Sequence, residues 1–209
     1  MNSFPDTKLD VSDAELDVTL QKACVGTGLD LGTGIELARA ALTMRYAGID
    51  PATVFASALS YYDTGDAGKE HDYISAISDG PSLCDDFIVK TNCGSNIFVD
   101  CPLIVLAILA ARGCCGRMIM TDGDGDAVFG NYALAMKEGK LSAALAPNMI
   151  ELRQEPVDNS VANDRGCRDV SAVDAASWRE ICGLADRCLV SGSEESRLND
   201  AGAGLVDED

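Results

Sequence analysis

The sequence predicts an α+β fold, because helical patterns fill the N-terminal third, short β-type runs fill the middle, and another helical pattern precedes the tail. The 209 residues suffice for a sizeable core, so we expect residues 1–209 to form a single domain. We expect a small, mostly antiparallel sheet with a buried helix and a C-terminal helix. A disordered N-terminus over about residues 1–10 and an extended tail, residues 191–209, packed on the domain complete the prediction.

Three helices are predicted in the first third from residues that cap helix ends, each followed by apolar residues at helical spacing. Ser12-Asp-Ala-Glu15 fits a capping box for a helix from about 12 to 25. Thr33-Gly-Ile-Glu36 repeats that box for a second helix, which stops at Gly48. Asp50-Pro51 supplies an N-cap and a first-turn proline for the third.

The middle of the chain predicts strands around one buried helix. Phe87–Thr91 and Ile97–Val99, on either side of a turn, are typical of a pair of short strands. Residues 102–111 are almost wholly apolar, which predicts a buried helix that ends at Gly113.

Further β segments and a last helix follow. Arg117–Thr121 and Ala127–Phe129 flank an Asp-Gly-Asp-Gly turn as the two arms of a hairpin do. Met149–Arg153 predicts another strand. Apolar residues that recur at helical spacing from Ala175 predict a final helix to about residue 188, where the tail begins.

The acidic balance excludes several classes of partner. Sixteen Lys and Arg stand against 34 Asp and Glu, which gives a net charge of −18. This field repels phosphate backbones and anionic bilayers, so we expect no nucleic-acid and no membrane partner. The N-terminus lacks the pattern of a secretory signal, and the apolar stretch 102–111 is shorter than the roughly 17 to 25 residues of a membrane-spanning helix. We expect a cytoplasmic protein.

Nine cysteines in a chain without a secretory signal indicate reduced thiols, so we expect no disulfide framework. Vicinal thiols such as Cys114-Cys115 can bind soft metals or cycle through oxidation. The chain has no C-x-x-C motif and His71 is its only histidine, which excludes a Cys₂His₂ zinc site. We interpret the cysteines as core or incidental thiols, predict no metal site and assign no cofactor.

Two glycine-rich runs resemble ligand-binding loops and fail specific tests. Residues 26–34 follow a helix instead of a strand and lack the third glycine of a dinucleotide loop, so they predict a helix connection. Residues 122–126 alternate Asp and Gly as the start of a calcium loop does. Ala127 and Ala133 replace the Gly and Glu that this loop requires, which favours a hairpin turn.

Residues 79–86 form the first candidate catalytic segment. A Gly-Pro turn would present Ser82 ahead of a strand, with carboxylates such as Asp85 available as a base or ligand. A capped turn with a purely structural role is the alternative interpretation.

The tail is the second candidate segment. Arg197 is the only cation after Arg187, and a guanidinium can bind a carboxylate through two parallel hydrogen bonds. Hydroxyls and carboxylates surround it, and an Ala-Gly-Ala-Gly hinge follows; the residues assigned to substrate binding or catalysis here are Ser193, Glu194, Ser196, Arg197, Gly202 and Gly204. The alternative is a helix C-terminus that frays into an acidic end.

The helix 178–188 and the tail after it resemble the C-terminus of a bacterial family catalogued as domain of unknown function 3726. The motifs that carry this resemblance are Ser193-Glu-Glu-Ser-Arg197 and Ala201-Gly-Ala-Gly-Leu205. Lys22-Ala-Cys-Val-Gly-Thr-Gly28 and the capping box after it are similar to the opening helix pair of that family. The resemblance implies a bacterial cytosolic protein and supplies no mechanism.

Two functions therefore remain open. The first is a small-molecule metabolic enzyme, or a subunit of one, that binds an anionic carboxylate substrate through Arg197 and handles protons with Ser82, Asp85 or Glu194. The second is a non-catalytic partner protein whose tail docks on another chain, either in a homo-oligomer or with a partner subunit.

Overall fold

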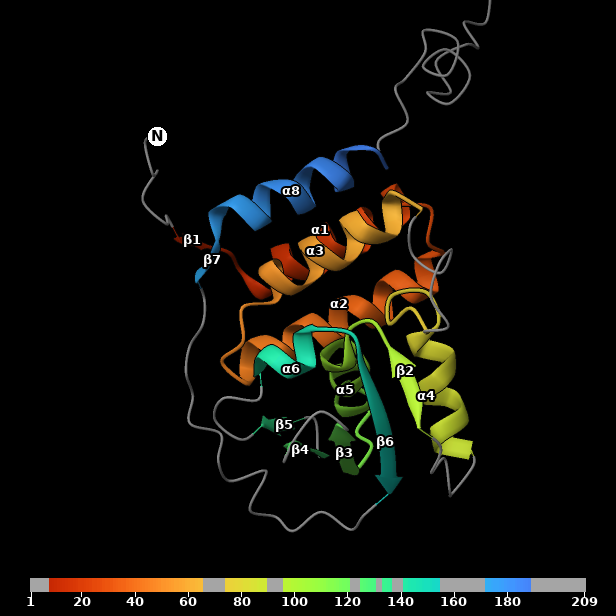
Figure 1. Ribbon diagram of the computed structural model, residues 1–209. Coiled ribbons are helices and arrows are strands. Elements are labelled where there is room, and N and C mark those ends of the chain that lie inside the picture. The colour runs from red at the N-terminus through yellow and green to blue at the C-terminus, as the bar shows by residue number, and fades with distance from the viewer. Residues whose placement is uncertain are drawn as a thin grey trace, which may run out of the picture.

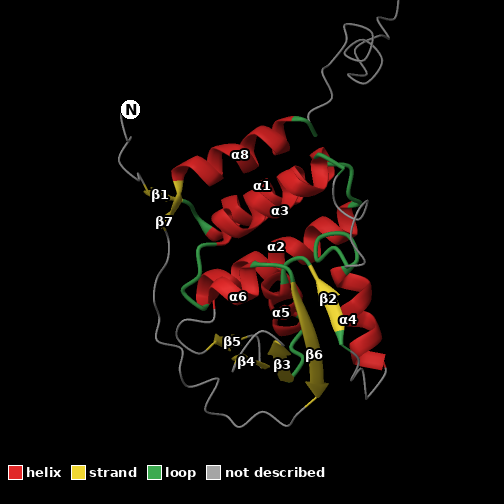
Figure 2. Ribbon diagram, viewed as in Figure 1, coloured by secondary structure: helices red, strands yellow, loops and turns green. Residues whose placement is uncertain are grey.

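The computed structural model confirms the α+β class (Figure 2). It describes residues 8–65, 74–89, 96–120, 125–130, 133–136, 141–154 and 172–188. The helices are α1 (Asp13–Gly26), α2 (Leu31–Tyr46), α3 (Pro51–Asp63), α4 (Gly80–Val89), α5 (Pro102–Ala111), α6 (Leu141–Leu145) and α8 (Ala175–Asp186). The strands are β1 (Lys8–Asp10), β2 (Ile97–Val99), β3 (Gly116–Met120), β4 (Gly125–Gly130), β5 (Ala133–Met136), β6 (Asn148–Gln154) and β7 (Ala172–Asp174).

The elements stack in layers, with α8 at one end and the sheet at the other (Figure 1). Helix α8 packs on α1 and α3, and α2 packs beneath α1. Helix α5 lies between α2 and the sheet, where it contacts β4 and β5, while α4 and α6 flank it. All described helices therefore lie on one side of the sheet.

Two antiparallel sheets organise the strands. The larger has the order β2-β6-β3-β4-β5, and alternate residues of β3 and β6 point into the core or away from it. The smaller pairs β1 with β7, Lys8 opposite Asp174. The expected disordered N-terminus is therefore too long, because residues 8–10 form a strand; residues 1–7 lie outside the described part of the chain.

The predicted helix starts are confirmed for α1 and α3 and wrong for α2. Ser12 and Asp50 accept backbone N–H groups as N-caps. In α2 the N-cap is Asp30, whose carboxylate accepts the backbone N–H of Thr33 at 3.0 Å and its hydroxyl at 2.6 Å. Thr33 thus lies within the first turn, since a carboxylate three residues earlier already caps the helix.

The predicted strand at 87–91 is wrong, because residues 80–89 form helix α4. Leu83, Cys84 and Phe87 lie on one buried face at helical spacing, and Phe87 meets Phe129 of β4 edge to face with ring centroids 6.0 Å apart. Packing thus overrides the β propensity of the Phe-Ile-Val run. Residues 90 and 91 lie outside the described residues.

The remaining strand and helix predictions are largely confirmed. Strand β2 forms as expected but pairs with β6. Strands β3 and β4 pair as the two arms of a hairpin, and β6 and α8 lie where the sequence predicts them. Residues 27–30 connect α1 and α2, with Gly28 at φ 92°, so the predicted helix connection is confirmed there, whereas residues 26 and 31–34 of it belong to the two helices. The sequence reasoning missed β1, β5, β7 and α6, which are too short for periodicity to reveal.

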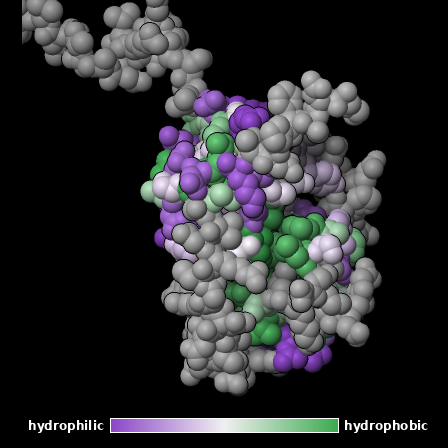
Figure 3. Space-filling view, turned by 90° about the vertical axis from the view of Figure 1, so that its left-hand side faces the viewer, coloured by the Kyte–Doolittle hydropathy of each residue, from purple (hydrophilic) through white to green (hydrophobic). Residues whose placement is uncertain are grey.

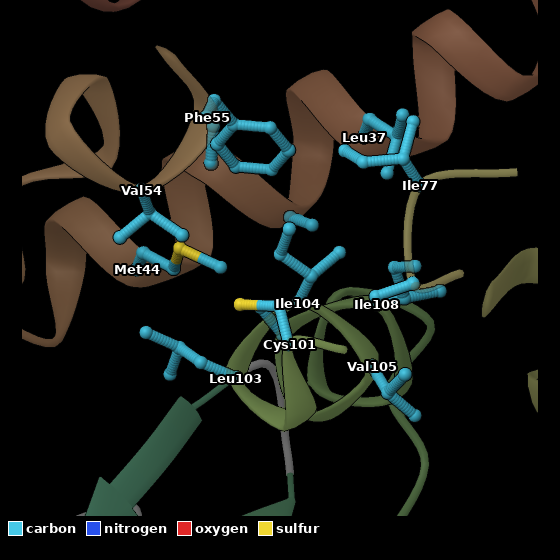
Figure 4. Packing of buried hydrophobic residues seen from close by; sticks show 14 of the residues in the cluster. Leu37, Met44, Val54, Phe55, Ile77, Cys101, Leu103, Ile104, Val105 and Ile108 are labelled. Carbon is cyan, nitrogen blue, oxygen red and sulfur yellow. The ribbon is translucent and has the colours of Figure 1, made fainter. Parts of the chain in front are cut away.

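Helix α5 supplies the centre of the core. Its residues 102–110 are all buried, so it has no polar face. Figure 4 shows Ile104 and Ile108 turned toward Leu37 and Met44 of α2 and Phe55 of α3. The fold depends on covering every side of this helix.

We expect Leu106→Ala to lower the free energy of unfolding by about 2 to 5 kcal/mol, because it removes a fully buried side chain and leaves a cavity. Leu145→Ala is the matched control, since Leu145 is 39% exposed, and should cost much less. Urea unfolding followed by circular dichroism measures both. Equal losses would contradict the central role of α5.

Gly26, the last residue of α1, marks a close approach between α1 and α8. A Cβ atom there would lie 2.0 Å from the carbonyl oxygen of Leu184 in α8. A backbone atom cannot rotate away from this clash, so the two helices would have to separate. Gly183, also in α8, would place its Cβ in open space.

We expect Gly26→Ala and Gly183→Ala to change stability in opposite directions. Gly26→Ala should destabilise by about 1 to 3 kcal/mol through overpacking. Gly183→Ala should stabilise by about 0.4 to 1 kcal/mol, since alanine restricts the unfolded chain and suits a helix interior. The urea midpoint reports both, and a gain for Gly26→Ala would show that the helices do not pack as closely as described.

Candidate functional site

Ser82 and Asp85, the two predicted catalytic residues that the structure describes, lie on the exposed side of α4. Ser82 occupies its first turn, and no described residue places a base within hydrogen-bonding distance of the hydroxyl. The Gly-Pro sequence therefore begins a helix instead of presenting a serine ahead of a strand. The geometry gives Ser82 no means of activation as a nucleophile from the described residues.

Asp85 is held in an ion-pair network centred on Arg112. Arg112 Nη1 donates to Asp85 Oδ1 at 2.8 Å, and Nη2 donates to Glu36 Oε2 at 2.6 Å. The arginine side chain is only 19% exposed, which reduces screening by solvent. The network joins α2, α4 and the end of α5, and it gives Asp85 a structural partner.

A polar cluster that the sequence reasoning missed lies just before α4. Asp100 follows β2, and its Oδ1 accepts the backbone N–H of Ala76 at 2.7 Å. Asp79 Oδ2 accepts the backbone N–H of Ser75 at 3.3 Å and the hydroxyl of Ser78 at 3.2 Å. Two carboxylates thus fix the turn that leads into α4. The only sequence signal was the frequency of Asp and Ser in residues 75–79.

Asp100 is the described carboxylate with a raised pKa. Burial raises the pKa, while hydrogen bonds from the Ala76 and Cys101 N–H groups and from Ser75 lower it in part, and the charge of Asp79 raises it further. A partly desolvated carboxylate of this kind can accept a proton, so Asp100 is the strongest acid–base candidate in the described chain. Asp100 also has a structural role, because the hydrogen bonds that it accepts from backbone N–H groups hold the turn in place.

The described cysteines are free, and burial makes most of them poor nucleophiles. It raises the pKa of Cys24, Cys84 and Cys101 to about 12. Burial also raises the pKa of Cys114 and Cys182. Cys84 donates its S–H to the carbonyl of Val105 at 3.7 Å, as a core thiol does. These five residues therefore stay protonated at neutral pH.

Within the described ranges, no three His, Cys, Asp or Glu residues gather as metal ligands do. His71 and residues 121–124 lie outside those ranges. So do the predicted tail residues, which are Ser193, Glu194, Ser196, Arg197, Gly202 and Gly204. The roles assigned to them stay predictions.

Leu141 and Leu145 on α6 are exposed apolar side chains, and Figure 3 shows hydrophobic side chains on that side of the molecule. Val89, at the end of α4, is 80% exposed. The outward register positions of the larger sheet carry the apolar residues Phe98, Ile119, Val128, Ala133, Ala135 and Met149. Of these six residues only Phe98 is exposed, and the other five are half-buried.

Comparison with known proteins gives no assignment, because no family model, curated protein or solved structure matches the chain. The resemblance to the bacterial family therefore stays a prediction. Among the described helices, even α5, with ten almost wholly apolar residues, falls short of the length that crosses a membrane.

Replacing Asp100 tests its raised pKa. In the wild type Asp100 stabilises the fold fully below pH 3.8, its unfolded value, and this contribution is lost as pH rises through the higher folded pKa. Asp100→Asn keeps an acceptor for the Ala76 N–H and removes the charge. The stability of the variant relative to wild type should therefore increase from pH 3 to pH 7 in urea unfolding. A constant difference would contradict a raised pKa.

Proposed function

We propose that this chain is a non-catalytic interaction protein whose C-terminal tail docks on another subunit. The observation that carries the proposal is the state of the predicted catalytic residues within the described part of the chain, where Asp85 forms an ion pair with Arg112 at 2.8 Å and Ser82 lies in the first turn of α4. The net charge of −18 would keep such an assembly soluble.

The surroundings of the predicted catalytic residues support the same conclusion. Asp85 is paired with Arg112, and Ser82 has no base among the described residues. The buried thiols of Cys24, Cys84 and Cys101 remain protonated at neutral pH. A catalytic site needs a nucleophile and base in mutual reach, and these groups supply none.

One observation favours the second candidate function, a small-molecule metabolic enzyme or enzyme subunit. Asp100 combines partial burial with a raised pKa, which is typical of general bases. In that function Arg197 would bind the carboxylate of the substrate. Asp100 would take the proton-handling role that the sequence assigned to Ser82, Asp85 or Glu194.

A thermal-shift screen against small carboxylates separates the two functions. We expect no carboxylate to raise the melting temperature of the wild type. A carboxylate at about a hundred times its Kd would add about 2.7 kcal/mol of stability, which such a scan resolves. Arg197→Ala is compared with the control variant Arg187→Ala. In the wild type the Arg187 guanidinium donates to Asp63 at 2.7 Å. Stabilisation of the wild type and Arg187→Ala, but not of Arg197→Ala, would overturn the proposal.

A further inference from the structure

We infer that strand β7 and helix α8, here called the C-terminal unit (residues 172–186), open from the protein as one piece while the other described elements stay folded. The unit lies at one end of the layered structure, at the opposite end from the larger sheet (Figure 1). It packs on β1, α1 and α3, whereas α5 packs on α2, α4, α6 and the larger sheet. Opening of the unit therefore leaves these neighbours of α5 in place.

One apolar stripe holds α8 against the other helices. Trp178, Ile181, Leu184 and Ala185 recur at helical spacing and are all buried. Because α8 packs on α1 and α3, this stripe is the side of the helix that they cover. An amphipathic helix with one covered side can exchange that cover for an apolar groove on another chain.

Polar contacts at both ends align α8 with α3. At the start, Asp50 Oδ2 accepts the backbone N–H of Asp174, the N-cap of α8, at 2.7 Å. At the end, Arg187 Nη1 donates to Asp63 Oδ2 at 2.7 Å. The Arg187 side chain is 52% exposed, and ion pairs in contact with water contribute little to stability. These contacts therefore position the helix more than they hold it.

Strand β7 adds a small contact. Its three residues pair with the three residues of β1, which are all exposed, and Val173 is its buried side chain. A two-stranded sheet is marginally stable by itself. The apolar stripe of α8 is thus the main contact between the C-terminal unit and the helices it packs on.

Helix α1 can keep its place when the unit opens, because its other contact is with α2. A Cβ atom at Gly34 of α2 would lie 3.3 Å from the Cβ of Cys24 in α1, which shows how closely these helices pack. The tail follows α8 in the sequence, so a partner subunit that binds both would hold the unit open. This coupling to a partner rests on the proposed function, whereas the opening itself does not.

Hydrogen exchange of the wild-type chain, measured by NMR, tests the opening. We expect the amides of residues 175–186 to be at least about tenfold less protected than those of residues 102–111, because the open unit is more populated than the unfolded chain. Equal protection of the two segments would show that α8 opens only with the whole fold. Protection that falls steadily toward one end of α8 would indicate fraying, which also contradicts opening as one piece.

Trp178, the single tryptophan of the chain, gives a second test because it lies on the apolar stripe. Urea unfolding is followed on the same samples by tryptophan fluorescence and by circular dichroism. We expect the fluorescence transition at a lower urea concentration, since most of the helical signal comes from helices that stay folded. Coincident transitions would mean that the C-terminal unit and the core unfold together.

Ile181→Ala and Leu106→Ala form a matched pair of variants, because each removes a fully buried side chain, one from α8 and one from α5. Ile181→Ala should lower the urea midpoint of the fluorescence transition and leave the circular dichroism midpoint near that of the wild type. Leu106→Ala should lower the circular dichroism midpoint. Equal shifts of both midpoints in Ile181→Ala would overturn the inference. None of these results depends on the carboxylate screen, so the inference can fail while the proposed function stands.

Discussion

Burial of α5 is the constraint on which the described architecture depends. A helix that is apolar on every side must be covered on every side, and no single layer can do so. The α2 helix covers one side, the inward face of the sheet covers the opposite side, and α4 and α6 cover the flanks. These elements come from well-separated parts of the sequence, so α5 brings them together.

Local signals predict the elements whose ends or composition decide their structure. The caps Ser12 and Asp50 define α1 and α3 because a side chain there satisfies helix N–H groups whatever lies around it. The composition of α5 alone predicts its burial. Residues 87–91 were predicted as a strand because the Phe-Ile-Val run favours β structure, whereas the packing of Leu83 and Phe87 against the core makes residues 80–89 helical.

The candidate site is less predictable, because its contacts join distant residues. Arg112 reaches Asp85 and Glu36, which lie 27 and 76 positions away in the sequence. The sequence identified Asp85 as a carboxylate that could act as a base or a ligand. It did not reveal the ion pair that this carboxylate forms with Arg112. Asp100 was missed because its burial and its hydrogen bond from Ala76, 24 residues earlier, exist only in the folded chain.

The contacts of α8 with α1 also determine when the helical layers can form during synthesis. Gly26 of α1 lies against the backbone of Leu184 in α8. Strand β1 can pair only after its partner β7, residues 172–174, has been synthesised. The ribosome releases the N-terminal segments long before these partners. The buried side of α1, with Leu16 and Leu20, therefore stays without α8 until residues 175–186 have been synthesised. A nascent chain of this protein has a long interval in which chaperones can bind that surface.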